Sequence, residues 1–136
     1  MNIDRFKKDH AAIFTAIKEL KSLVSSGISE NADAIAKTII SISSAIKLHL
    51  AAEDQFLYPA LANSANSAAV QLGKKFQDEM GGIAAAYVEF AGRWNIASKI
   101  TANPEGFRAD ANNIFQALHQ RIQRESKELY PLVEQI

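Results

Sequence analysis

The chain has 136 residues, no cysteine, and 15 basic and 15 acidic residues, which give a net charge of zero and a pI near 6.8. We expect one domain over residues 1–136, because a chain of this length can bury a core, and the charge balance argues against binding to nucleic acid or to an anionic membrane. Without cysteine there are no disulfides or thiolate ligands, so a metal would need nitrogen, oxygen or thioether ligands.

Hydrophobic spacing predicts a first helix over residues 3–24, where apolar side chains recur in alternating steps of three and four. The pattern stops at Gly27, which suits a helix C-cap. A second helix is predicted over residues 35–58 and ends near Pro59. Phe56 lies on the apolar stripe of that second helix, so we expect its side chain to be buried.

After a loop around Asn63, the spacing predicts a third helix whose apolar stripe covers residues 76–94. Its internal glycines weaken the helical propensity by about 1 kcal/mol each relative to alanine. Pro104 marks the start of a fourth helix that continues to Leu132, because proline is favoured at the first helical position. Four long amphipathic helices with short loops predict an all-α, antiparallel up-down-up-down four-helix bundle.

One motif occurs twice in the chain. The first copy is H-L-A-A-E-D-Q-F-L-Y-P, from His49 to Pro59, and the second is R-I-Q-R-E-S-K-E-L-Y-P, from Arg121 to Pro131. A histidine and a glutamate four residues apart lie on one face of a helix, where they can bind one cation together. An arginine cannot bind a cation. The repeat therefore indicates a duplicated metal-binding bundle in which half of the site has changed.

Five polar residues interrupt the apolar stripes of three predicted helices. Burying such a group without a partner would cost several kcal/mol, so these residues must meet one another, a ligand or water. In an antiparallel bundle they lie at a common level, because one is near the start of the first helix and the others are near the ends of theirs. The five residues are His10, His49, Glu53, Arg121 and Glu125.

A second internal repeat adds Met80 to this level. The phrase D-H-A-A-I, which begins at Asp9, aligns with E-M-G-G-I, which begins at Glu79, so Met80 takes the place of His10. The chain therefore divides into two pseudo-equivalent helical hairpins. The first carries His10, His49 and Glu53, and the second carries Met80, Arg121 and Glu125.

With these motifs the chain resembles the hemerythrin-like (HHE cation-binding) domain family over essentially its whole length. The resemblance implies a duplicated four-helix bundle that typically binds two non-haem irons bridged by carboxylates. It also implies a role in oxygen or nitric oxide binding, iron handling or redox sensing. The family's ligand pattern is matched at His10, His49, Glu53 and Glu125. Met80 and Arg121 stand where the family usually has histidine, so we expect a degenerate second half-site.

Two main interpretations of the site remain open. In the first, His10, His49 and Glu53 hold one metal, because two imidazoles and a carboxylate suit non-haem iron(II) and also zinc. Glu125 would then be a fourth ligand or a bridge. In the second, no metal binds, and the Arg121 guanidinium replaces the cation between Glu53 and Glu125. The chain would then be a structural or protein-interaction bundle.

Other polar and soft side chains are weaker candidates. His119 lies two residues before Arg121, as a possible ligand of a second metal, but two residues turn a helix by about 200°, so His119 should point away from Arg121. We expect Met80 to fill the core rather than to bind a metal. Tyr58 and Tyr130 should pack near the helix ends, where each buried hydroxyl needs a partner.

We therefore expect a cytoplasmic, hemerythrin-like protein that holds fewer than two irons per chain. Its role would be to sense, store or scavenge O2, NO or the metal itself. No run of 18 apolar residues predicts a membrane span. The sequence identifies no catalytic residue, so we favour a binding protein over an enzyme, although an open iron site suits oxidoreductase chemistry.

Overall fold

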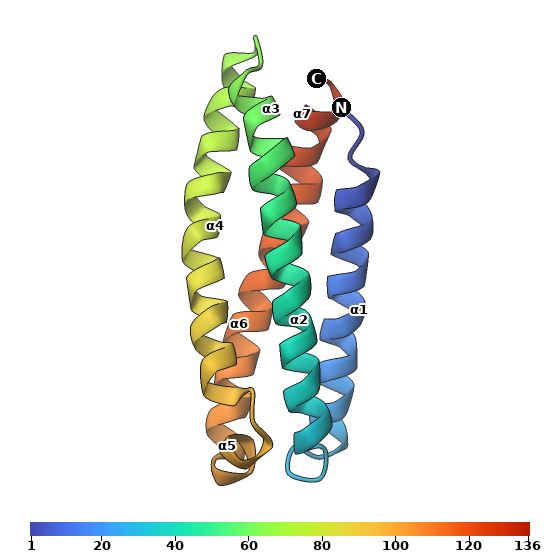
Figure 1. Ribbon diagram of the computed structural model, residues 1–136, viewed down its shortest axis with the longest axis vertical. Coiled ribbons are helices and arrows are strands. Elements are labelled where there is room, and N and C mark those ends of the chain that lie inside the picture. Colours follow the sequence, from blue (N-terminus) through green and yellow to red (C-terminus); the bar gives the residue numbers. More distant parts are fainter.

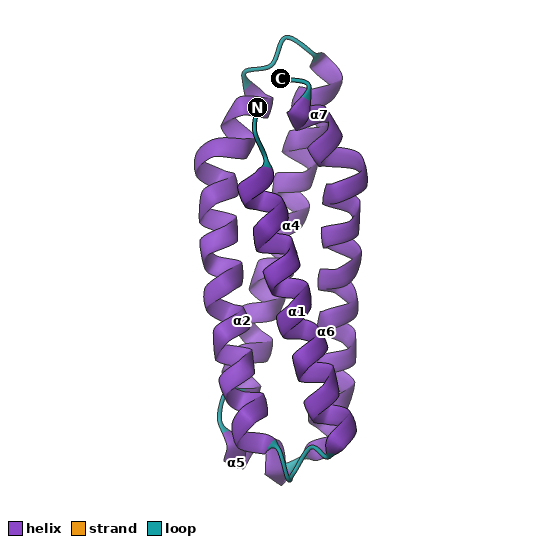
Figure 2. Ribbon diagram, turned by 90° about the vertical axis from the view of Figure 1, so that its right-hand side faces the viewer, coloured by secondary structure: helices purple, strands orange, loops and turns teal.

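The computed structural model describes all 136 residues, and the chain is helical with no strand. The long helical segments lie side by side in an elongated bundle (Figure 1). The two termini meet at one end of the bundle, where the ammonium group of Met1 donates a hydrogen bond to the carbonyl of Ile136 (3.3 Å). The loop after the first helix and the short fifth helix lie at the opposite end (Figure 2).

The helical elements follow one another with short connections, and two of the long segments contain a π-helical turn. In chain order they are α1 (Asp4–Ser26), α2 (Ala32–Ala52), the π turn η1 (Glu53–Leu57), α3 (Tyr58–Ala62), α4 (Ser67–Trp94), α5 (Ala97–Ala102), α6 (Pro104–Arg124), the π turn η2 (Glu125–Leu129) and α7 (Tyr130–Glu134).

The ends of the long helices lie close to where the sequence predicts them. Helix α1 ends before Gly27, which has a φ of 128°, a conformation that residues with side chains rarely adopt. Helix α6 begins at Pro104, and the side-chain oxygen of Asn103 caps it by accepting a hydrogen bond from the N–H of Gly106 (3.0 Å). The sequence analysis did not predict the short helix α5.

The apolar core has two parts, and the buried polar residues lie between them. Along α1, Phe6 belongs to the part near the termini, His10 follows, and Ile13 belongs to the larger part. Along α2 the order is reversed, with Ile46 in the larger part before His49. The polar residues therefore form a layer across the bundle, with apolar packing on both sides.

The continuous helical stretch Ala32–Ala62 is long and apolar enough to cross a membrane by length and composition, which the sequence analysis did not anticipate. A buried core helix meets the same criterion. Ile35, Ile39 and Ile42 of this stretch are fully buried within the larger part of the core. One apolar face of the stretch therefore packs against the neighbouring helices, while Ile40 and Leu48 on its other face are exposed.

The two π turns change which side chains face the core. In the first turn, the N–H of Tyr58 donates to the carbonyl of Glu53, five residues earlier, instead of four as in an α-helix. Pro59 follows, and a proline cannot donate the backbone hydrogen bond that an α-helix would need there. Leu57 is consequently fully buried, whereas Phe56 is 47% exposed. The prediction that Phe56 is buried is therefore wrong, because it assumed an uninterrupted α-helical period.

The second π turn has the same form and the same effect. The N–H of Tyr130 donates to the carbonyl of Glu125, and Pro131 follows directly. Leu129 and Val133 are fully buried, while Leu132, which the α-helical period places in the core, is only half-buried. The repeated sequence E-x3-L-Y-P thus forms a repeated structure.

This register can be tested with a pair of alanine variants. Leu57→Ala should lower the free energy of unfolding by about 2–5 kcal/mol, because it leaves a cavity in the core. Phe56→Ala, one residue earlier, should change it by only about 0.5 kcal/mol, as surface substitutions usually do. Urea unfolding followed by circular dichroism measures both values. A larger loss for Phe56→Ala than for Leu57→Ala would show that the π turn is absent.

Candidate metal centre

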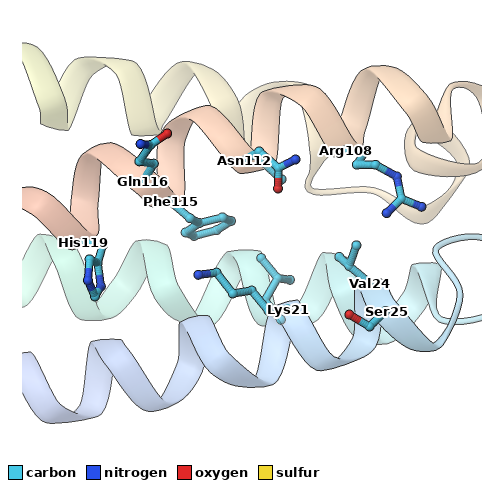
Figure 3. A pocket seen from close by; sticks show the side chains of 10 residues that line it. Lys21, Val24, Ser25, Arg108, Asn112, Phe115, Gln116 and His119 are labelled. Atoms are coloured by element: carbon cyan, nitrogen blue, oxygen red, sulfur yellow. The ribbon is translucent and has the colours of Figure 1, made fainter.

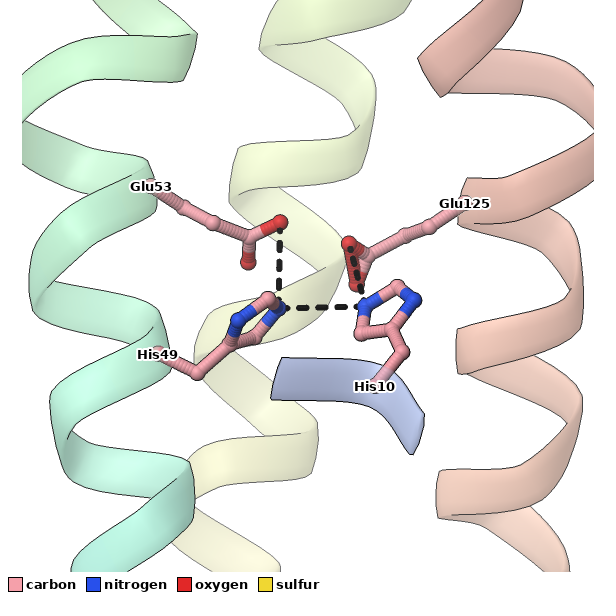
Figure 4. A group of neighbouring side chains, drawn as sticks. All are labelled: His10, His49, Glu53 and Glu125. Atoms are coloured by element: carbon pink, nitrogen blue, oxygen red, sulfur yellow. Dashed lines mark hydrogen bonds and ion pairs between the residues drawn. The ribbon is translucent and has the colours of Figure 1, made fainter. Parts of the chain in front are cut away.

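The polar layer brings together the residues that the sequence singled out. Four of them each direct one nitrogen or oxygen atom to a common point, and these atoms lie within 4.8 Å of one another (Figure 4). The four are His10 from α1, His49 from α2, Glu53 from η1 and Glu125 from η2, and all are buried. Arg121 from α6 is also buried beside them.

The two imidazoles face each other across the centre of the cluster. The Nε2 atoms of His10 and His49 are 3.1 Å apart. On the other side of its ring, Nδ1 of His49 lies 3.1 Å from a carboxylate oxygen of Asp9. A carboxylate that accepts from one ring nitrogen orients the ring and leaves the other nitrogen free to bind a cation. This role of Asp9 was not predicted from the sequence, although Asp9 precedes His10 in the phrase D-H-A-A-I.

The two carboxylates complete the cluster from the opposite side. Oε2 of Glu53 lies 3.4 Å from Nε2 of His49, and Oε2 of Glu125 lies 3.7 Å from Nε2 of His10. Oε1 of Glu53 and Oε2 of Glu125 are buried without any hydrogen-bond partner. Leaving such atoms unsatisfied is costly, and a cation bound among them would remove that cost. The donor set therefore fits a metal ion.

The electrostatics of the cluster also favour a positive charge at its centre. Burial alone would lower the pKa of His49, but its interactions with Glu53 and Asp9 raise that pKa to about 9. Burial raises the pKa of Glu53. Burial acts in the same direction on Glu125, but its interaction with His10 and the charge of Arg121 hold its pKa below the usual range. A cation that binds His49 must displace its proton.

In the second half-site, a guanidinium occupies the centre. Nε of Arg121 donates to Glu125 (3.2 Å), and Nη2 donates both to the hydroxyl of Tyr58 (3.0 Å) and to the carbonyl of Phe76 (2.8 Å). The guanidinium carbon also lies 4.5 Å from the centre of the Phe76 ring, a cation–π contact. Arg121 forms no ion pair with Glu53, so it does not lie between the two glutamates as the metal-free interpretation requires.

An acidic residue precedes His10 in the first half and Met80 in the second. Asp9 contacts His49, and in the same relation a carboxylate oxygen of Glu79 lies 3.7 Å from Nη1 of Arg121. The two half-sites therefore share their outer acid and their central glutamate. They differ in that the second contains a fixed cation where the first contains an imidazole.

Met80 lines a small cavity next to the cluster. The cavity has a volume of about 20 Å³ and is bordered by His49, Arg121 and Glu125 as well as by apolar side chains. A cavity needs roughly 10–15 Å³ to hold one water molecule. The buried centre is therefore adjoined by room for one very small molecule.

The two tyrosines of the repeat have partners in the polar layer, each in the half-site of the other hairpin. The hydroxyl oxygen of Tyr130 lies 2.9 Å from Nε2 of His10, and the hydroxyl donates to Oε2 of Glu53 (3.3 Å). The hydroxyl of Tyr58 instead accepts from Arg121. The sequence analysis expected both to pack near the helix ends. The signal that it missed is their constant distance of five residues from the central glutamates.

His119 lies outside the cluster, as the helical geometry predicts. Its ring is exposed, stacks edge-on against Phe14 at 5.1 Å, and borders a groove of about 520 Å³ between α1 and α6 (Figure 3). The groove is also bordered by two basic side chains, Lys21 and Arg108, and contains none of the four clustered residues. The wide groove and the buried cluster are therefore separate features.

The ion pair in the second half-site can be tested by unfolding. Arg121→Ala should lower the free energy of unfolding by about 3–5 kcal/mol, because it leaves Glu125 buried without its partner. Arg124→Ala is the matched control, since Arg124 also contacts Glu79 and Phe76 but is only half-buried, and this variant should lose several-fold less unfolding free energy. Equal effects of the two variants in urea unfolding would contradict a buried, structurally important Arg121.

A comparison with protein-family models matches residues 1–133 to the hemerythrin HHE cation binding domain. Searches of the curated proteins and of the solved structures gave no match. The matched range includes the four clustered residues and both copies of the repeated motif.

Proposed function

The chain belongs to the hemerythrin HHE cation-binding domain family, and from this premise we propose that it binds one non-haem iron per chain. The observation that carries the proposal is the buried convergence of two imidazoles and two carboxylates, which are His10, His49, Glu53 and Glu125. We further propose that the helices have the family's antiparallel, up-down-up-down four-helix arrangement, which places the hairpins as two halves around the layer.

The donor set supports iron as the cation. Two imidazoles with carboxylates suit non-haem iron(II), and the same set also accepts zinc. Iron would supply open positions for a small ligand and the capacity for redox change. The protein's own contribution is to orient His49 through Asp9 and to keep the ligand atoms away from bulk water.

The second half-site supports a count of one ion rather than two. Arg121 is held by four neighbouring groups, including Glu125 and Glu79, and its positive charge lies where the second half would bring its ligands together. Met80 contributes no charged or nitrogen ligand there. A second cation would have to displace a guanidinium that three hydrogen bonds already hold in place.

The size of the adjoining cavity supports a small ligand. A volume of about 20 Å³ beside His49 and Glu125 suits a diatomic molecule such as O2 or NO and is too small for an organic substrate. We therefore propose a role in binding or sensing such a gas, in redox sensing or in iron handling, within the cytoplasm. No group is placed to act on a larger substrate, so a binding role is favoured over an enzymatic one.

The alternative function is a metal-free structural or protein-interaction bundle. It is favoured by the buried ion pair between Arg121 and Glu125, which already satisfies part of the layer. It leaves His10, His49 and Glu53 to satisfy one another, and it gives no partner to the buried Oε1 of Glu53. The iron-binding proposal accounts for both half-sites, and the alternative accounts for one.

The proposal is tested by loading the purified protein anaerobically with iron(II) and adding NO. The wild type should retain iron on gel filtration, and NO should change its absorption and electron paramagnetic resonance spectra. His49→Ala should retain little iron and show no such change, because it removes an imidazole ligand. His119→Ala is the control and should behave as the wild type, since His119 lies outside the cluster. Full iron retention by His49→Ala would refute the site.

The count of one ion predicts a gain of metal on reversion. The double variant Met80→His with Arg121→His restores the histidines that the family usually has at these positions. It should bind about one additional iron per chain, because Glu125, Glu79 and Tyr58 are already in place around the second half-site. Elemental analysis of the two proteins, loaded in parallel, measures the difference. An unchanged iron content would show that more than these two residues prevents the second site.

A further inference from the structure

We infer that Tyr130 is an additional ligand of the cation, which it binds through its phenolate oxygen. This inference rests on the proposed function. The hydroxyl oxygen of Tyr130 is 2.9 Å from Nε2 of His10 and 3.3 Å from Oε2 of Glu53, and the residue is only 1% exposed. Its two polar neighbours are therefore both ligand atoms of the proposed site.

Four atoms form a closed ring whose edges match the spacing of ligands around one ion. The successive distances are 3.1 Å from His10 to His49, 3.4 Å from His49 to Glu53, 3.3 Å from Glu53 to Tyr130 and 2.9 Å from Tyr130 to His10. Metal–ligand bonds of ~2.1 Å place neighbouring ligand atoms ~3.0 Å apart at right angles and ~3.4 Å apart at the tetrahedral angle. Glu125, at 3.7 Å from His10, lies slightly outside this ring.

A bound cation would also remove the main alternative partner of the phenol. Nε2 of His10 has a single lone pair, so it cannot bind a cation and accept a hydrogen bond from Tyr130 at the same time. The buried hydroxyl would then keep only the 3.3 Å contact with Glu53. Binding the same cation gives the Tyr130 oxygen a stronger partner at the place where it already lies.

The second half-site shows what a tyrosine of the repeat does when a cation is present. Tyr58 occupies the equivalent place in the repeat, and its hydroxyl oxygen accepts a hydrogen bond from the Arg121 guanidinium (3.0 Å). Its oxygen is thus directed to the fixed cation of the second half-site. By the same internal symmetry, the oxygen of Tyr130 is directed to the cation position of the first half-site.

The backbone and the packing hold Tyr130 in this position. In an α-helix, residues five apart lie about 140° from each other around the axis, but a π turn brings them onto nearly the same face. The π turn η2 does this for Tyr130 and Glu125, whose backbone groups are hydrogen-bonded. The phenol ring also stacks on the imidazole of His10, with 5.0 Å between the ring centres and 17° between the planes.

Binding requires that the phenol lose its proton. The O–H bond of Tyr130 breaks as its oxygen bonds to the cation, and the proton is released to the buffer. Direct bonding to a metal ion stabilises the deprotonated phenol, as it does for bound water and thiols.

The experiment uses the absorption that a phenolate bound to iron(III) produces in the visible range. The protein is loaded with iron(II) and oxidised with one equivalent of ferricyanide, which accepts one electron from each iron. We expect a charge-transfer band in the wild type and its loss in Tyr130→Phe at equal iron content. Tyr58→Phe is the matched control and should keep the band, because Tyr58 contacts Arg121 instead of the iron site.

The outcomes separate this inference from the proposed function. A band that is absent from the iron-loaded wild type, or unchanged in Tyr130→Phe, would overturn the assignment and leave Tyr130 as a hydrogen-bond partner. Wild-type protein that takes up no iron would overturn the proposed function and this ligand with it. If Tyr130→Phe does not fold, resonance Raman spectra of the iron-loaded wild type, with and without ring-deuterated tyrosine, replace it. Vibrations of a tyrosine bound to iron should be enhanced and should shift with the label. The absence of such vibrations would overturn the inference.

Discussion

A layer of buried charge lies across the bundle, with apolar core on both sides of it. Each ionisable side chain in such a layer costs several kcal/mol unless a partner of opposite charge or a hydrogen bond offsets the loss of water. The helices must therefore bring their polar residues to one level, and any shift of one helix along another would leave a carboxylate or an imidazole unpaired. The register of the whole bundle depends on this layer.

The two halves of the layer differ in how the negative charge of the buried glutamate is balanced. In the second half, the central glutamate Glu125 has a permanent cation beside it, the guanidinium of Arg121. The first half has no fixed cation: Oε1 of Glu53 and the second oxygen of Glu125, Oε2, are buried without a hydrogen-bond partner, and the neighbouring carboxylates raise the pKa of His49 to about 9. A mobile cation would complete the first half in the way that the covalently attached guanidinium completes the second. This comparison within one chain is the strongest physical argument for a single metal ion.

The long helices and the candidate ligands could be predicted from the sequence, because both follow from the periodic spacing of apolar residues. Helix α1 and the start of α6 follow from apolar spacing, Gly27 and Pro104. The cluster follows from polar residues on apolar stripes, since burial leaves such residues only one another as partners. The motif repeated at His49 and Arg121 further showed that the two halves differ.

Features that depend on departures from regular geometry were not predicted. The π turns displace Phe56 from the core and bring Leu57 into it, and a fixed period of 3.6 residues cannot describe that change. The second π turn directs Tyr130 into the polar cluster of the first half-site. There it contacts His10, which lies 120 positions away along the chain. The contact of Asp9 with His49 also depends on how two helices face each other, which spacing within one helix does not determine.

The most direct test of this account is the number of iron ions per chain in wild-type protein, which is produced with added iron and purified without chelator. Elemental analysis together with a protein assay gives the ratio. The account predicts one iron per chain, held in the first half-site and excluded from the second by Arg121. Two irons would show that Arg121 does not replace a metal ion, and protein without iron or another metal would show that the polar layer is complete without one.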